Sequence, residues 1–393
     1  MFGISTQKTY AACITLWGIF AVGPSWANAD PGDDNSSAFF QATYVNQIKS
    51  DFTSPYSGAR SLLTRQEGDI RNSYTFTSTA YLALKTWQGG EVIYNPEMFQ
   101  GIPFSNLSGL GGFNNGELQK GTAIPAIYYN ARAFVRQTIG LGGEAVTLEK
   151  GPNQTQSTVD SERLVLSYGS FSTLDYFDQN SYSHDPRTQF LNWSTMASGA
   201  YDYAASSRGY TFGLVAEYFK DDWTFRFARL AMPMTPNVLV LDDNLLRQHG
   251  DQFEVTRQYR LAGRPGKARV LVFQNKGLMA SYVDAINEAN QNHPSSPPNI
   301  FEARNSIKTK NGYGVNIEQA LADDLGVFAR YSWNDGKTET QAFTDINRSL
   351  SGGAVIRGAR WGRAQDQLGV AFARNALSPD AIDYLSRGGV TCS

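Results

Sequence analysis

The sequence predicts an all-β fold, specifically a transmembrane antiparallel β-barrel. The composition is rich in aromatic residues (13%), poor in charged residues (18%) and contains 37 glycines, which favours aromatic strands joined by glycine-containing turns. Several segments alternate apolar and polar residues with a period of two, as barrel strands in lipid must. No apolar run after residue 29 approaches the ~20 residues of a membrane helix, so a membrane-spanning role requires a closed barrel.

The first 29 residues are interpreted as a signal peptide. Lys8 precedes an apolar stretch at residues 10–22, and Ala27-Asn28-Ala29 has the small-x-small pattern of a cleavage site. A buried helix or a membrane anchor is the alternative, but the apolar stretch is too short to cross ~30 Å of hydrocarbon. We therefore expect export and cleavage after Ala29.

The remaining chain is expected to have two parts. Residues 30–66 form an N-terminal segment, either a plug or an extra strand, and residues 67–393 form the outer-membrane barrel. Localisation in a Gram-negative outer membrane follows from this organisation.

Two early segments show the alternation most clearly. In residues 70–85 the even positions are mostly apolar and the odd positions are mostly polar. In residues 128–141 the pattern places Ala131 on the apolar face and Asn130 on the polar face, with Phe134 as an exception. Both segments are predicted to be strands.

Two hairpins are predicted from short polar turns between alternating segments. One turns at Lys220-Asp221-Asp222 and the other at Ala322-Asp323-Asp324. Further strands are expected at 89–95, 161–168, 193–203, 253–262, 267–277, 350–361 and 367–375. Long connections are expected at 98–125, 172–192, 232–252 and 279–309. Two short turns then follow each other near 204–222. This breaks the alternation of short and long connections, so the sequence does not assign every connection to the periplasmic or the extracellular end of the barrel.

Composition excludes some functions and leaves others open. A formal charge of −2 and a pI near 6.0 argue against a nucleic-acid partner, which requires a basic face. A secreted or periplasmic β-sandwich or β-propeller, whose strands also alternate, stays open as a soluble alternative.

No enzyme, metal or cofactor signature is recognised. The chain has three histidines without a close pair, whereas zinc sites need clustered ligands. His184-Asp185-Pro186-Arg187 is interpreted as a loop turn rather than acid–base machinery. Glu91 and Glu97 would suit a glycosidase only at a defined separation, and they serve equally well as pore charges.

Charged residues recur on the polar faces of the predicted strands, where a barrel would direct them into its lumen. Both signs of charge in a water-filled pore orient dipolar solutes and offer hydrogen bonds to sugar hydroxyls. The alternative is that these charges satisfy one another inside a filled barrel. The pore-lining or constriction candidates are Arg71, Glu91, Glu97, Arg132, Arg136, Glu217, Arg226, Glu318 and Arg330.

Several motifs resemble the carbohydrate-selective porins of the OprB type. They include Glu67-Gly68-Asp69-Ile70-Arg71-Asn72, Trp87-Gln88-Gly89-Gly90-Glu91, Tyr94-Asn95-Pro96-Glu97, Gly109-Leu110-Gly111-Gly112-Phe113-Asn114-Asn115-Gly116-Glu117, Arg132-Ala133-Phe134-Val135-Arg136, His184-Asp185-Pro186-Arg187-Thr188-Gln189-Phe190 and Arg360-Trp361-Gly362-Arg363. The resemblance extends over roughly residues 67–389.

The resemblance implies a 16-stranded outer-membrane barrel that admits glucose and related small sugars by passive diffusion. It implies a constriction of arginines and acidic residues, outer-membrane lipid as surroundings, and no cofactor. The family continues for several strands past Gly389, so we expect a C-terminally truncated barrel that lacks its last few strands. Unpaired edges in lipid are costly, so such a chain is expected to insert poorly.

Three functions therefore remain: a sugar porin, a barrel without sugar preference, and a secreted or periplasmic carbohydrate-binding or carbohydrate-active protein. The sequence does not decide which sugar crosses, whether a homo-oligomer forms, or which loop folds inward.

Overall fold

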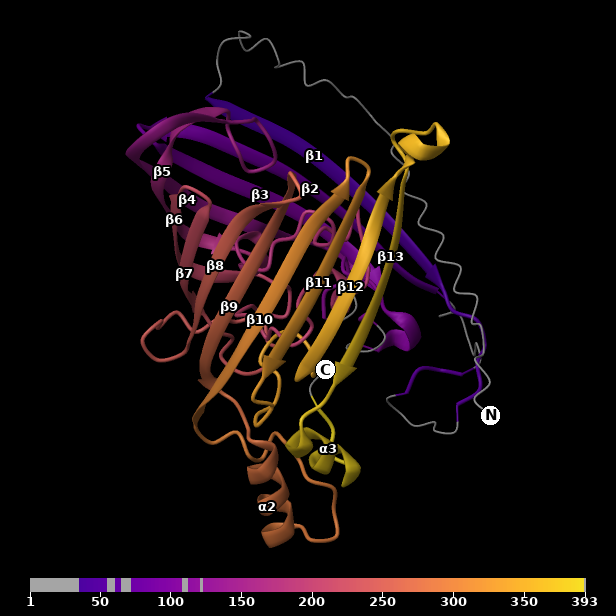
Figure 1. The fold of residues 1–393 in the computed structure, drawn as a ribbon. Coiled ribbons are helices and arrows are strands. Elements are labelled where there is room, and N and C mark those ends of the chain that lie inside the picture. Colours follow the sequence, from indigo (N-terminus) through magenta and orange to yellow (C-terminus); the bar gives the residue numbers. More distant parts are fainter. Residues whose placement is uncertain (1–34, 55–60, 65–71, 108–111, 121–122, 392–393) are drawn as a thin grey trace.

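The computed structural model describes residues 35–54, 61–64, 72–107, 112–120 and 123–391. The predicted signal peptide and the candidate Arg71 lie outside these residues. The described chain forms one antiparallel sheet of 13 strands in which every strand pairs with the next along the chain. Figure 1 shows these strands side by side, tilted and curved around an interior. Such a meander is neither a two-sheet sandwich nor a propeller.

The strands are β1 (Ser36–Ile48), β2 (Asn72–Trp87), β3 (Gly90–Ile102), β4 (Ala123–Leu148), β5 (Ser157–Phe171), β6 (Thr211–Lys220), β7 (Trp223–Ala231), β8 (His249–Leu261), β9 (Arg264–Leu278), β10 (Ile307–Ala322), β11 (Leu325–Asn334), β12 (Arg348–Arg357) and β13 (Gln367–Ala376). The short helices are η1 (Phe104–Asn106), η3 (Thr173–Asp175), α1 (Trp193–Met196), α2 (Tyr282–Asn292), η4 (Gly358–Trp361) and α3 (Pro379–Ser386). None of the described helices is both long and apolar enough to cross a bilayer.

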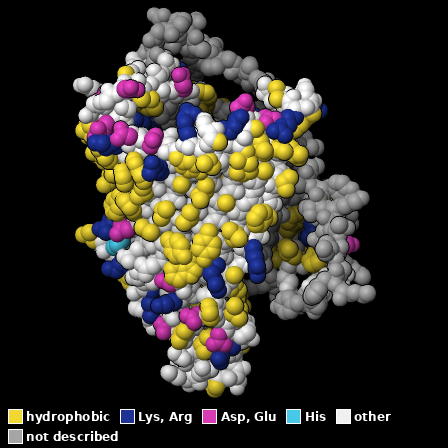
Figure 2. Space-filling view, viewed as in Figure 1, with side chains coloured by type: hydrophobic (Ala, Val, Ile, Leu, Met, Phe, Trp, Pro, Cys, Tyr) yellow, Lys and Arg dark blue, Asp and Glu magenta, His cyan; other side chains and the backbone are white. Residues whose placement is uncertain are grey.

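The two faces of the sheet differ as the alternation predicts. On β2 the odd-numbered Ser73, Thr75 and Thr77 are buried, whereas the even-numbered Leu82 and Leu84 are exposed. Figure 2 shows hydrophobic side chains in a band across the middle of the visible face, with charged side chains above and below it. This is the arrangement of a barrel wall whose outer face meets lipid.

Short and long connections alternate strictly along the described sheet. Between 193 and 203, where a strand was expected, the chain forms α1 and irregular backbone. That prediction is wrong, and removing it restores the alternation. The short connections are 88–89, 149–156, 221–222, 262–263, 323–324 and 358–366, and the longer ones are 103–122, 172–210, 232–248, 279–306 and 335–347. Figure 1 shows α2 and α3 at one end and η4 at the other.

A bulge in β4 overturns part of the predicted alternation. Asn95 pairs with Arg132 and Pro96 pairs with Asn130, so Ala131 is the extra residue. Proline has no N–H for the ladder, and a bulge reverses which face the following residues occupy. Ala131 is therefore buried and Asn130 exposed, the reverse of the prediction.

The connection between β5 and β6, residues 172–210, lies inside the curved sheet. Its Tyr201 and Ala204 are fully buried in the main hydrophobic cluster, with Leu230 and Phe273 from the wall. Phe134, the exception in the β4 pattern, faces inward and packs edge-on against Phe171 with ring centroids 5.8 Å apart. Phe171 ends β5 and in turn packs against Tyr176 of the inserted connection, with ring centroids 5.1 Å apart, so the aromatic residue at this inward position belongs to the cluster that holds the connection.

Among the described residues, β1 and β13 each pair with one neighbour only, so the sheet has two edges. Near the edge at β13, α2 packs against α3 in a separate buried cluster that includes Ile286, Ile300 and Tyr384. This cluster forms a small cap at the end with the long connections.

Candidate functional site

A cavity of about 1660 Å³ lies inside the sheet beside the inserted connection. Its lining comes mainly from β1 to β4 and the inserted connection, with further residues from the β1–β2, β3–β4 and β11–β12 connections and from residues 375–391. Closed small-molecule pockets measure ~300–1,000 Å³, so this cavity exceeds the size of a single-ligand pocket.

Arg187 is the centre of the charged network that faces the cavity. Its Nε donates to Glu117 Oε1 at 2.8 Å, and its Nη1 donates to Gln41 Oε1 at 2.9 Å and to the Tyr81 hydroxyl at 2.6 Å. Glu97 Oε2 lies 3.6 Å from Nη2. Burial favours the neutral form of Arg187, but Glu117, Tyr81 and Glu97 together outweigh burial and raise the pKa, so the guanidinium stays charged.

The local turn explains why Arg187 points into the cavity. The carboxylate of Asp185 accepts from the backbone N–H of Arg187 at 2.9 Å and from the Thr188 hydroxyl at 2.7 Å. Gln189 Oε1 accepts from the N–H groups of His184 and Asp185. Asp and Pro favour such turns because the side chain bonds nearby backbone and the ring fixes φ.

Arg132 is the second cavity-lining guanidinium, and Asp175 sets its position. Arg132 donates to both carboxylate oxygens of Asp175, at 2.7 and 2.5 Å. Asp175 also accepts from the N–H of Ser172 in the capping box of η3. The cap of η3 therefore fixes the position of the Asp175 carboxylate. Because a bidentate pair is geometrically specific, the carboxylate in turn fixes the direction of the Arg132 guanidinium.

Tyrosine rings form one wall beside these charges. The rings of Tyr129 and Tyr210 lie 5.9 Å apart, and both hydroxyls donate to Glu97 Oε1, that of Tyr210 at 3.1 Å. Arg208 lies 4.7 Å from the Tyr129 ring centroid. Burial and then Glu97 raise the pKa of Tyr210, so its hydroxyl remains a donor.

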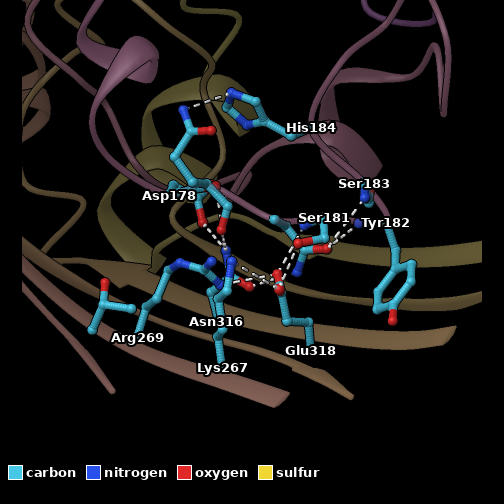
Figure 3. A network of polar contacts seen from close by, with 12 residues as sticks. Asp178, Ser181, Tyr182, Ser183, His184, Lys267, Arg269, Asn316 and Glu318 are labelled. Carbon is cyan, nitrogen blue, oxygen red and sulfur yellow. Dashed lines mark hydrogen bonds and ion pairs between the residues drawn. The ribbon is translucent and has the colours of Figure 1, made fainter. Parts of the chain in front are cut away.

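The opposite side of the interior is filled rather than hollow. Arg330 Nε donates to Asp178 at 3.1 Å, and both side chains are about 2% exposed or less. Figure 3 shows Asp178 and its neighbours from the inserted connection facing the strand residues Asn316 and Glu318. Glu318 accepts from the Ser181 N–H at 2.8 Å and hydroxyl at 2.7 Å. These charges join the connection to the wall.

A second buried pair fixes the far end of the same connection. Lys310 lies 2.9 Å from Asp202, and each side chain is 1% exposed. Asp202 also accepts from the backbone N–H groups of residues 341, 342 and 343, at 2.9 to 3.0 Å. Burial raises the pKa of Asp202, but Lys310 and these N–H groups more than offset it, so its pKa is lowered.

The structure separates the sequence-predicted site residues into two groups. Glu97 and Arg132 line the cavity. The others that are described sit in ion pairs away from it: Glu91 with Arg136, Arg226 with both Glu217 and Glu254, Glu318 with Arg269, and Arg330 with Asp178.

Several cavity residues were absent from the sequence prediction. Arg187, Glu117 and Asp175 lie in connections, where no strand period marks a direction. The motif His184-Asp185-Pro186-Arg187 was recognised as a turn and as part of the family resemblance, but Arg187 was not among the pore candidates. The charged residue at the end of this Asp-Pro turn was the available signal.

Comparisons with known proteins agree with this fold. The model of the OprB family, described as carbohydrate-selective porin, matches residues 69–391. The high-pH structure of OprB from Pseudomonas putida is 14% identical, covers 90% of this chain and 78% of that chain, and superposes with a TM-score of 0.61. At that identity the likeness supports the fold alone. No curated protein sequence matches this chain.

Two further solved structures are similar over most of their length but superpose less well. The low-pH structure of Pseudomonas putida OprB is 11% identical, with 88% of this chain and 79% of that chain covered and a TM-score of 0.43. OmpT from Vibrio cholerae, in its trimer form, is 10% identical, with 87% and 90% covered and a TM-score of 0.37.

Proposed function

This chain belongs to the OprB family of carbohydrate-selective outer-membrane porins, and from that premise we propose that it admits monosaccharides such as glucose by passive diffusion. The family consists of channels rather than enzymes, so the alternative of a secreted carbohydrate-active protein is not supported. No cofactor or energy source is required for diffusion down a gradient.

The observation that carries the proposal is the mixed lining of the cavity. Arg187 and Arg132 supply donors, Glu97 and Glu117 supply acceptors, and the Tyr210 ring supplies an apolar face. Hexoses present hydroxyls around an apolar ring face, so such a lining replaces part of their hydration. Conduction needs several weak sites rather than one tight site, and a cavity of about 1660 Å³ provides room for that.

The site residues are proposed to divide in the same way. We expect Glu97, Arg132 and the connection residues Arg187 and Glu117 to contact solute. The predicted candidates Glu91, Arg136, Glu217, Arg226, Glu318 and Arg330 are proposed to stabilise the interior instead, because they pair with other protein groups and lie outside the cavity lining.

Liposome swelling tests the function directly. Proteoliposomes containing the closed barrel are placed in isotonic glucose, in a disaccharide or in a larger oligosaccharide. We expect swelling to be fastest in glucose and to slow as the solute grows. Equal exclusion of all three would contradict a sugar channel, and equal entry of sugars and of salts of similar size would contradict sugar preference.

Barrel closure is a separate proposal. We propose that the closed form has the 16 strands of the family and that strands beyond the 13 described complete it. The two edges of the described sheet support this, because unpaired backbone groups in lipid cost several kcal/mol each. Heat-modifiable gel mobility and protease resistance of the 393-residue chain test it. A resistant, heat-modifiable band from this chain alone would contradict it.

Processing and assembly complete the proposal. We propose cleavage after Ala29 by signal peptidase, which N-terminal sequencing of the exported protein would check.

Homo-oligomer formation is proposed as an assembly state that native mass measurement in detergent would test. A mature protein that begins elsewhere, or a strictly monomeric mass, would contradict these two points respectively.

A further inference from the structure

The connection between β9 and β10 carries a cluster of metal-ligating side chains that the channel does not use. Glu288 lies on α2, His293 ends that helix, and Glu302 lies in the turn that follows. One ligand atom from each residue lies within 4.8 Å of the other two. The residues that line the interior cavity include none of these three.

The imidazole stands between the two carboxylates. His293 Nε2 is 4.0 Å from Glu288 Oε1 and 3.9 Å from Glu302 Oε2. Zinc bonded to nitrogen and oxygen at ~2.0–2.1 Å in tetrahedral geometry holds its ligand atoms about 3.4 Å apart. Small rotations close this gap, because the His293 side chain is 56% exposed and that of Glu302 is 45% exposed.

Neighbouring amides already orient both carboxylates. Asn292 Nδ2 donates to Glu288 Oε1 and Asn299 Nδ2 donates to Glu302 Oε1, each at 2.9 Å. Hydrogen bonds of this kind fix ligand direction in metal sites. The other oxygen of Glu288, Oε2, is enclosed and has no hydrogen-bond partner within the described part of the chain. An enclosed carboxylate oxygen without a partner calls for a donor, a water or an ion beside it.

The backbone under the cluster is firmly held. Ala285 and Ala289 on α2 and Ile300 and Ala303 in the turn are all buried in the cap cluster. The N–H of Ile300 donates to the Tyr384 hydroxyl at 3.1 Å. Glu288 and Glu302 therefore project from two segments that share one core, which is what a pre-formed site requires.

The local charge also favours a cation. In the residues that the structure describes, the only ion-pair partner of Glu288 and of Glu302 is His293. No lysine or arginine in the described residues pairs with either carboxylate, so two negative charges lie on either side of one imidazole without a cation to offset their repulsion. A divalent ion at this point removes the repulsion.

We infer that Glu288, His293 and Glu302 form a binding site for a divalent transition-metal ion of the zinc, nickel or copper type. One imidazole with two carboxylates suits these ions, whereas magnesium and calcium prefer oxygen ligands alone. The site lies at the end with the long connections, which in outer-membrane barrels faces the cell exterior. A bound ion joins α2 to the turn at 299–303 and so closes the cap.

No metal site was predicted from the sequence, because zinc sites need clustered histidines, cysteines or carboxylates at characteristic spacing and the three histidines form no close pair. Here the ligands are separated by five and nine residues, and the turn that unites them follows a proline-rich stretch, Pro294-Ser295-Ser296-Pro297-Pro298.

Calorimetric titration of the folded full chain in detergent with zinc chloride tests this inference. We expect one zinc ion per chain. His293→Ala and Glu302→Gln should each weaken binding by about 10- to 100-fold, as loss of a ligand or its support does in other sites. Glu149→Gln, an exposed glutamate in the turn between β4 and β5, is the matched control and should leave binding unchanged.

Three results would overturn the inference: no saturable zinc binding, binding that survives both ligand variants, or magnesium binding as tight as zinc binding. Heat-modifiable mobility is measured for each variant, and Glu302→Gln serves as the test if His293→Ala fails to fold. Glucose entry should be the same with and without zinc, because the cluster lies outside the cavity. A loss of zinc binding with intact glucose entry separates this inference from the proposed function.

Discussion

The two sides of the barrel interior use similar charged residues for different purposes. On the filled side, Asp178 and Asp202 meet Arg330 and Lys310 with every side chain about 2% exposed or less. On the open side, Arg187 and its acidic partners border a cavity of about 1660 Å³. Lumen charge alone therefore does not identify a channel lining. What separates the two sides is whether the paired charges border open space, as Arg187 does, or are enclosed by protein on every side, as Arg330 and Lys310 are.

The largest effect is expected from a substitution that disrupts the buried ion pairs of the filled side. Asp202→Ala leaves Lys310 buried without its counter-ion and three backbone N–H groups without an acceptor. Removing one partner of a buried pair costs about 3–5 kcal/mol. We expect the free energy of unfolding, measured by urea titration in detergent or liposomes, to fall by about that amount.

The matched control is Asp366→Ala, which removes an aspartate paired with the 72% exposed Arg363. Exposed pairs contribute little, so this variant should unfold near the parent midpoint. Similar losses in both variants would mean that Asp202 does not fix the inserted connection.

The next effect concerns the open side and should appear in transport more than in stability. Arg187→Met removes the positive charge beside Glu97 and Glu117. One unit charge at ~4 Å in a water-like medium is worth about 1 kcal/mol, or roughly a five-fold preference. Reversal potentials in a salt gradient should therefore shift toward cations by about that factor, and a potential that does not move would remove Arg187 from the conduction path.

A smaller effect tests whether geometry matters on the open side. Asp175→Asn keeps the shape of the side chain but weakens its hold on Arg132, whose pair is 16% and 27% exposed. Pairs at this exposure contribute ~0–1 kcal/mol, so glucose swelling rates should change by up to about five-fold while the unfolding midpoint hardly moves.

Asp251→Asn provides the control for that experiment. Asp251 pairs with Arg229 at 2.7 Å and similar exposure, but both positions alternate with buried inward residues such as Gln252 and so lie on the outer face. Its glucose rate should equal that of the parent. If both variants change the rate equally, the effect arises from general destabilisation.

The sequence predicts the wall of this molecule far better than its interior. Period-two alternation located both hairpins because each strand has one lipid-facing and one inward face. The bulge at Ala131 was missed because it depends on the pairing of Pro96 with Asn130 across two strands. A long connection at 172–192 was predicted, but its inward position was not, because buried pairs such as Arg330 with Asp178 join residues 152 positions apart.

The smallest expected effect is a change in how stability depends on pH, and it concerns His184 at the boundary between the two sides. His184 lies where the inserted connection meets the cavity, and its Nε2 is 3.0 Å from Gln179 Nε2. Burial lowers the pKa of His184, Arg330 lowers it further, and Asp178 acts in the opposite direction. The ring is therefore neutral in the folded protein at pH values where the unfolded chain already binds a proton.

A lowered histidine pKa makes the folded state less stable as the pH falls below the unfolded value of ~6.5. The loss continues until the pH reaches the lower folded-state pKa, where both states are protonated. We expect His184→Gln to show a shallower decline in unfolding free energy between neutral pH and that point, with glucose entry at neutral pH unchanged. An identical slope in variant and parent would mean that water reaches the ring, and the open side would then extend past His184 toward Asp178.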